Sequence, residues 1–60
     1  MITKVWLRPQ PKKSISYPDC YPSIKLGFEH PGNKVNILDN DNILQAQYSL
    51  DAVVRLEFIP

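Results

Sequence analysis

The sequence predicts a small all-β domain of five to six short antiparallel strands, folded as an open barrel or a sandwich. Several short segments alternate apolar and polar residues with the two-residue period of a half-buried strand. Turn-forming residues separate these segments, and no stretch has the period of a firm helix. The length of 60 residues fits one domain, taken as residues 1–60.

The first strand is expected from Ile2 to Arg8. Thr3, Val5 and Leu7 share one face, and the opposite face is unusual because it places a tryptophan between two cations. That face carries Ile2, Lys4, Trp6 and Arg8.

Residues 9–13 are expected to form an extended, proline-rich arm or edge connection. The two prolines in this stretch cannot donate hydrogen bonds to a sheet, which excludes a central strand. Residues 14–17 are long enough only for an edge strand. Tyr-Pro then occurs twice around Asp19 and Cys20, which predicts a rigid turn. A residue before proline is restricted to extended backbone, so the rings of Tyr17 and Tyr21 are expected at fixed angles.

A hairpin is expected in the middle of the chain. Ile24, Leu26 and Phe28 alternate on one face of residues 23–29 and are expected in the core. Pro31 and Gly32, after His30, fit the second and third positions of a type II turn, where the third requires positive φ.

The return strand, residues 34–38, places Val35 and Ile37 inward. Residues 39–42 are expected to form a turn, because their side chains bond their own backbone. Residues 43–49 fit either a strand or a short capped helix, and their alternation favours the strand.

The last segment, residues 51–60, places Val54, Leu56 and Phe58 inward. The outward residues are Val53, Arg55, Glu57 and Ile59. Apolar residues on both faces suit a strand that is covered on both sides, as at a dimer seam.

The composition predicts association with another chain. A domain of this size has a thin stability margin, and a single cysteine with no metal-ligand cluster provides no internal staple. We therefore expect a homodimer or docking onto a partner. The absence of a signal-like or membrane-spanning stretch predicts a soluble, cytoplasmic protein with no membrane partner.

The residues present do not suggest catalysis, a cofactor or a metal. His30 lies in the expected turn, and Cys20 follows an aspartate, with no neighbouring positive charge to activate the thiol. The acidic run at residues 39–42 lacks the glycine and closing glutamate of a calcium loop. We expect a protein that is not an enzyme.

The expected binding surface is cationic and aromatic. The first 13 residues hold four of the seven Lys and Arg residues and no acid. Aromatic and arginine side chains anchor protein interfaces, and rings beside cations also stack nucleic-acid bases. A third possibility is that Trp6 simply covers a second sheet or a dimer seam. The surface comprises Lys4, Trp6, Arg8, Lys12, Lys13, Tyr17 and Tyr21.

Residues 26–47 resemble the second half of the swapped-hairpin AbrB/MazE/SymE pattern. The shared features are a Leu-Gly step, a Pro-Gly turn, a Lys-Val strand and a last hydrophobic strand. The resemblance implies an intertwined dimer that binds DNA or a toxin through its basic N-terminal strand. The chain lacks the preceding helix, has Asn42 in place of the usual glycine, and carries an additional C-terminal strand.

The sequence therefore predicts a non-enzymatic protein-binding module, of the kind that a small viral or accessory inhibitor or adaptor uses to occupy a partner surface. One alternative is a small nucleic-acid-binding protein, either OB-like or AbrB-like, whose affinity would fall steeply with salt. Another is a structural subunit of a larger assembly.

Overall fold

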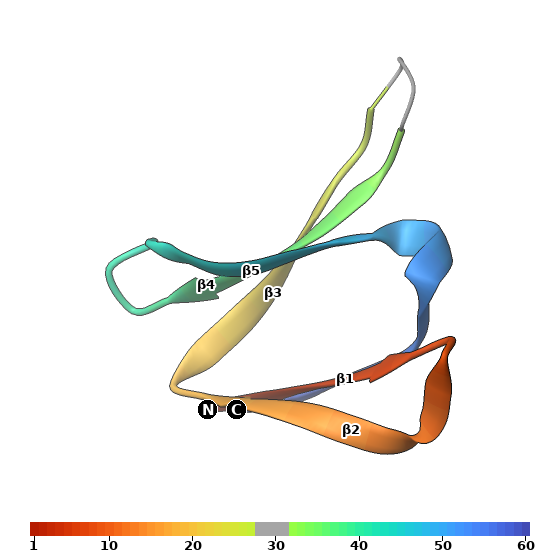
Figure 1. Cartoon of the computed structure of the whole chain (residues 1–60). Helices are drawn as coiled ribbons and strands as arrows, with labels where there is room; N and C mark the ends of the chain where they lie inside the picture. The colour runs from red at the N-terminus through yellow and green to blue at the C-terminus, as the bar shows by residue number, and fades with distance from the viewer. Residues whose placement is uncertain (28–31) are drawn as a thin grey trace.

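The chain folds into six strands, seen in a computed structural model that describes residues 1–27 and 32–60 (Figure 1). A single 3-10 turn, η1 (Leu50–Ala52), is the one helical element in these residues. The strands confirm the all-β prediction. They are β1 (Ile2–Leu7), β2 (Gln10–Pro18), β3 (Cys20–Lys25), β4 (Lys34–Asp39), β5 (Leu44–Ser49) and β6 (Val53–Ile59).

The strands form two three-stranded antiparallel sheets. We call the sheet ordered β2-β1-β6 sheet A and the sheet ordered β3-β4-β5 sheet B. Asp19, at the corner where β2 leads into β3, has a φ of 58°, and its N–H donates to the Met1 carbonyl. The second connection between the two sheets is η1, which joins β5 of sheet B to β6 of sheet A (Figure 1). The arrangement is a small open sandwich, and no helix in the described residues is long and apolar enough to cross a membrane.

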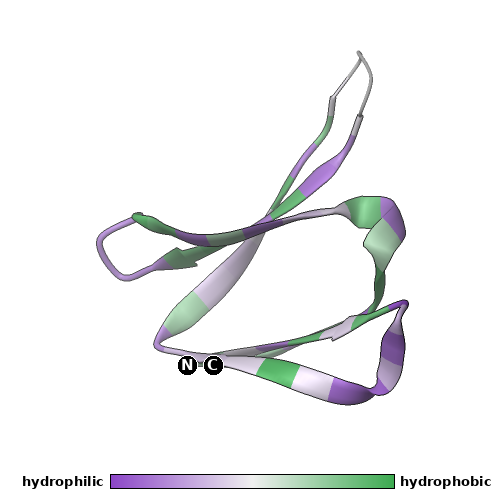
Figure 2. Cartoon of the chain, in the orientation of Figure 1, coloured by the Kyte–Doolittle hydropathy of each residue, from purple (hydrophilic) through white to green (hydrophobic). Residues whose placement is uncertain are grey.

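The core lies between the two sheets. Thr3 and Val5 of β1, Cys20 of β3, and Val35 and Ile37 of β4 are buried, as the alternation predicts for all but the cysteine. The Thr3 hydroxyl donates to the Cys20 carbonyl at 2.7 Å, which ties one sheet to the other. Figure 2 shows hydrophobic and hydrophilic residues alternating along the strands that enclose this core.

The predicted core face of the middle hairpin is wrong at two positions. Ile24 is 55% exposed and Leu26 is 66% exposed. Ile24 pairs with Val35, so it lies on the inward face. However, residues 24–27 and the opposing residues 32–34 project past the other sheet (Figure 1), which leaves Ile24 and Leu26 exposed. Phe28 lies outside the described residues.

The proline-rich stretch belongs to a strand rather than to a free arm. Gln10 pairs with Leu7 and Ser14 pairs with Trp6, so residues 11–13 have no partner in β1 and bulge from the ladder. The edge position of β2 agrees with the prediction, because an edge strand tolerates both proline and a bulge.

The last strand differs from its predicted pattern at its start. Trp6 faces Arg55 whereas Leu7 faces Val53, so Val54 is an extra residue. Val53 therefore packs against the core, and Val54 is 45% exposed. Leu56 is half-buried against the core as predicted, but Phe58 at the sandwich edge is 43% exposed.

The connections follow the predicted turn chemistry where they are described. Asp39 Oδ1 accepts hydrogen bonds from the N–H groups of Asp41 and Ile43, which closes the β4–β5 turn. Residues 44–49 form β5, which confirms the strand over the helix. Gly32 has a φ of 86°, as its predicted turn position requires, while His30 and Pro31 lie outside the described residues.

Candidate protein-binding surface

The seven residues of the predicted binding surface fall into separate regions of the fold. Lys4 and Trp6 lie on the outer face of sheet A, opposite the buried Thr3 and Val5. Arg8 begins the β1–β2 turn. The remaining residues lie in β2 and β3, namely Lys12, Lys13, Tyr17 and Tyr21.

On the outer face of sheet A, two cations lie beside a single acid. The Arg55 guanidinium lies 4.7 Å from the centroid of the Trp6 ring, and Arg55 also pairs with Glu57 at 3.2 Å. Lys4 stands directly across from Glu57 in the β1–β6 ladder. One face of the Trp6 ring is therefore already occupied by a cation, which leaves less of the ring available for stacking. Alternation in the sequence does not predict this contact, because the bulge in β6 decides which residue faces Trp6.

Arg8 connects the β1–β2 turn to η1 through hydrogen bonds, which we call the Arg8 clasp. Its Nε and one terminal nitrogen donate to the Asp51 carbonyl at 3.1 and 2.8 Å, and its backbone N–H donates to the Ala52 carbonyl at 2.9 Å. These bonds fix the start of the β1–β2 turn to η1. Arg8 therefore holds the β1–β2 hairpin in place, and its guanidinium is engaged within the chain.

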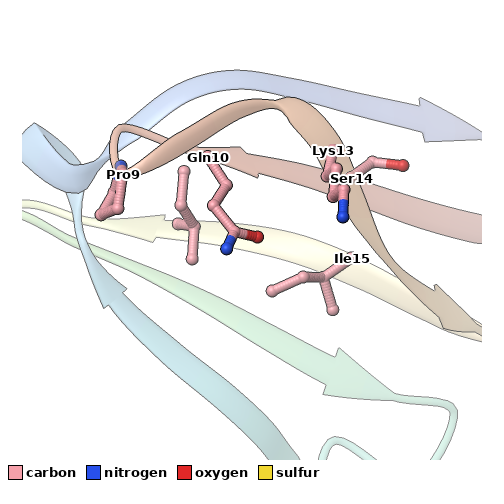
Figure 3. A pocket seen from close by; sticks show the side chains of 6 residues that line it. Pro9, Gln10, Lys13, Ser14 and Ile15 are labelled. Atoms are coloured by element: carbon pink, nitrogen blue, oxygen red, sulfur yellow. The ribbon is translucent and has the colours of Figure 1, made fainter.

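The bulge in β2 creates a hollow on the hairpin. Its volume is about 300 Å³. In Figure 3 the side chains of Gln10 and Ile15 extend from the hairpin toward the second sheet. Ile15 pairs with the buried Val5 and so lies on the inner face of sheet A, yet it is 42% exposed because the sandwich is open there. The hollow is lined by Leu7, Pro9, Gln10, Lys13, Ser14 and Ile15.

We call these six residues together with Lys12 the hairpin site. Lys12 and Lys13 are exposed, and a shallower depression of about 340 Å³ runs beside both of them along residues 10–13. Arg55 with Glu57 forms the one ion pair in the described residues, so no described acid pairs with either lysine. The hairpin site is thus an apolar hollow whose cationic rim is not paired with any acid of the described residues.

The sequence indicated the two lysines of this site but not its apolar lining. Leu7 and Ile15 carry the signal of ordinary inward-facing strand residues. The hollow beside them results from the three-residue register shift between Trp6 and Leu7, and a single sequence does not reveal such a shift.

The two tyrosines do not join the hairpin site. The hydroxyls of Tyr17 and Tyr48 are hydrogen-bonded to each other between the sheets. Burial, assisted by this hydrogen bond, raises the pKa of Tyr17 to about 12. Tyr21 lies on the opposite face of β3 from the buried Cys20, and its hydroxyl donates to Asn42 Oδ1. Both tyrosines therefore form hydrogen bonds within the fold, away from the hairpin site.

The side chains that could act as a nucleophile or a metal ligand do not form a cluster in the described residues. Cys20 is 5% exposed, and no group of three metal-binding side chains occurs in the described ranges. His30 lies outside those ranges. No family model supports the resemblance of residues 26–47 to the AbrB/MazE/SymE pattern. Comparisons with protein-family models, with curated proteins and with solved structures found no match.

Proposed function

We propose that the chain is a protein-binding module whose partner inserts an apolar side chain into the hairpin site and places carboxylates beside its lysines. The observation that carries the proposal is the combination of an apolar hollow of about 300 Å³ with two lysines that have no described acidic partner. Such a site recognises an acidic segment with an aromatic or large aliphatic residue.

The dimensions and the charge both support this class of partner. A volume of about 300 Å³ lies at the lower end of the range for binding pockets, which suits one large side chain better than a cofactor. Lysines at the rim attract an acidic segment before contact, and the apolar wall then supplies the burial. The Arg8 clasp holds the hairpin in place before binding, which lowers the entropy lost on association.

This mode of action suits the role of a small inhibitor or adaptor. A chain of 60 residues that presents such a site acts by occupying a partner surface. A role as a structural subunit instead predicts open-ended assembly, which light scattering detects.

Nucleic-acid binding is the second candidate, and the adjacent lysines Lys12 and Lys13 favour it. Phosphates would take the place of the carboxylates. The Trp6 platform contributes less than the sequence suggested, because Arg55 already covers one ring face at 4.7 Å. Titration with single-stranded oligothymidylate, followed by Trp6 fluorescence, separates the two candidates. Phosphate binding weakens steeply between about 50 and 200 mM salt.

Selection of peptides from a displayed random library tests the proposed function. We expect enrichment of peptides that carry an apolar residue next to Asp or Glu. Lys13→Glu should weaken their binding at least tenfold, since reversal of a rim charge costs both attraction and specificity, at about 1.4 kcal/mol per tenfold change. Ile15→Asp should remove binding by placing a charge in the apolar wall.

The matched control is Lys25→Glu, which makes the same charge change on an exposed residue of sheet B. Its peptide affinity should equal that of the wild type. Selected peptides that bind Lys13→Glu and the wild type equally would contradict the proposal, as would a library that yields no binders.

A further inference from the structure

The outer edge of β6 is an unpaired strand in a sheet of three. In the described residues the backbone of β6 pairs only with β1, because sheet A is ordered β2-β1-β6. The strand spans Val53–Ile59, and three of its apolar residues are exposed: Val54 at 45%, Phe58 at 43% and Ile59 at 39%. A long apolar edge without a bulge in its centre or a proline invites another strand.

The sequence of β6 complements itself when read in the opposite direction. Leu56 is central, with a cation before it and an anion after it, and two apolar residues at each end. In an antiparallel pair centred on Leu56, Arg55 of one copy stands directly across from Glu57 of the other. The same contact occurs twice because of the two-fold symmetry.

The neighbouring registers lack this complementarity. In a symmetric antiparallel pair, two residues that face each other must point to the same side of the sheet, so odd residues face odd residues and even residues face even ones. Moving the centre of the pair by one residue therefore changes the partner of every residue by two positions. Centring the pair on Arg55 places two arginines opposite each other, and centring it on Glu57 does the same with two glutamates. The charges therefore select the register centred on Leu56.

We infer that a second copy of this chain binds at the β6 edge, in an antiparallel pair centred on Leu56, and forms a continuous sheet of six strands. The charges then alternate across it, because Lys4 already stands opposite Glu57, which in turn faces Arg55 of the second copy. Phe58 lies across from Val54 of the second copy and covers exposed apolar surface. The side chains of Arg55 and Glu57 are 65% and 38% exposed, so both are accessible to a partner strand.

This inference goes beyond the proposed function and is independent of it. The hairpin site lies on the β2 edge of sheet A, and self-pairing uses the β6 edge. A dimer of this kind leaves one hairpin site at each end of the combined sheet. Two linked sites raise the overall affinity for a repeated or dimeric partner without new contacts.

A charge-swap experiment tests the pairing, with sedimentation equilibrium at low salt as the measurement. Arg55→Glu places four acids at the seam and Glu57→Arg places four bases there, so each variant alone should dimerise at least tenfold more weakly than the wild type. An equimolar mixture restores every opposite-charge contact and should form a heterodimer. Lys25→Glu, on the other sheet, should dimerise as the wild type does.

The inference would be overturned if the wild type stayed monomeric up to about 1 mM, a concentration at which even an association of about −4 kcal/mol is seen. It would also be overturned if the single variants dimerised as well as the wild type, or if the mixture of folded variants stayed monomeric. Circular dichroism identifies a variant that does not fold. In that case hydrogen exchange of the wild type decides, since alternate β6 amides should gain protection as protein concentration rises, and unchanged protection would reject the pairing. Peptide binding by the hairpin site, measured on monomeric Arg55→Glu, distinguishes failure of this inference from failure of the proposed function.

Discussion

At the level of single residues, two side-chain hydrogen bonds connect the sheets within the part of the chain that the structure describes. The Thr3 hydroxyl donates to the Cys20 carbonyl within the core, and the Tyr17 and Tyr48 hydroxyls join at the sandwich edge. Only four hydrophobic residues in the described part of the chain are buried. With so little apolar burial, each of these contacts accounts for a substantial part of the free energy of unfolding.

Thr3→Val should lower the free energy of unfolding by about 1–3 kcal/mol. The substitution keeps the shape of the side chain but leaves the Cys20 carbonyl without its donor in the core. Thr3→Ser is the matched control, because it keeps the hydroxyl and loses about one methyl group, at about 0.8 kcal/mol. Urea unfolding followed by Trp6 fluorescence measures both. A valine variant as stable as the wild type would show that the carbonyl needs no partner.

Tyr17 should make the fold sensitive to alkaline pH. Its pKa is raised to about 12 in the folded chain, above the ordinary value of 10.0. Between these two values the unfolded chain loses the proton while the folded chain keeps it, so stability is full below pH 10 and falls as the pH rises toward 12. Tyr17→Phe removes this share of the pH dependence. Equal slopes of stability against pH in the variant and the wild type would contradict the assignment.

At the scale of elements, alternation in the sequence predicted the strands well and the bulges not at all. The faces of β1 and β4 are those expected, since Val5, Val35 and Ile37 are buried. The errors at Val53 and Ile24 have a common cause, because burial depends on where the opposite sheet ends and on register shifts between strands. Both are tertiary properties that local periodicity does not encode. The apolar lining of the hairpin site was missed for the same reason.

The Arg8 clasp should control the order of the β1–β2 hairpin. Arg8→Ala removes two side-chain hydrogen bonds to the Asp51 carbonyl, so hydrogen exchange in residues 7–15 should accelerate while the amides of β4 keep their protection. The affinity for acidic peptides should fall as well, because the site is less ordered before binding. Arg8→Lys keeps the charge but not both hydrogen bonds to the Asp51 carbonyl. Its hydrogen-exchange rates and its peptide affinity should therefore lie between those of the wild type and those of Arg8→Ala. Uniform acceleration across all strands would indicate a general loss of stability instead.

At the scale of the whole molecule, the fold leaves more large apolar side chains exposed than buried. Ten such residues are at least 37% exposed in the described ranges, and they are distributed over both sheets and the segments beside them. A chain that leaves this much apolar surface uncovered is expected to associate, with itself or with a partner. Association with a second copy or with a partner stays a prediction, and the choice of surface depends on the charges proposed to act at the hairpin site and at β6.

Self-pairing at β6 should make thermal stability depend on protein concentration. Association that favours the folded chain raises the melting temperature by mass action, and the unfolded chain gains nothing from it. We expect the melting temperature of the wild type to rise over a roughly hundredfold increase in concentration, and that of Arg55→Glu to stay constant. Differential scanning calorimetry measures both. A constant melting temperature in the wild type would argue that the β6 edge stays unpaired.

The hairpin site is proposed to bind an acidic segment that carries an apolar residue. The most direct test of this proposal is a titration of the isotope-labelled chain with a synthetic peptide of sequence Glu-Leu-Phe-Asp-Glu, followed by the NMR shifts of the backbone amides. We expect saturable shifts concentrated in residues 7–15, and their loss in Lys13→Glu. Shifts that spread over both sheets, or that persist unchanged in Lys13→Glu, would contradict it.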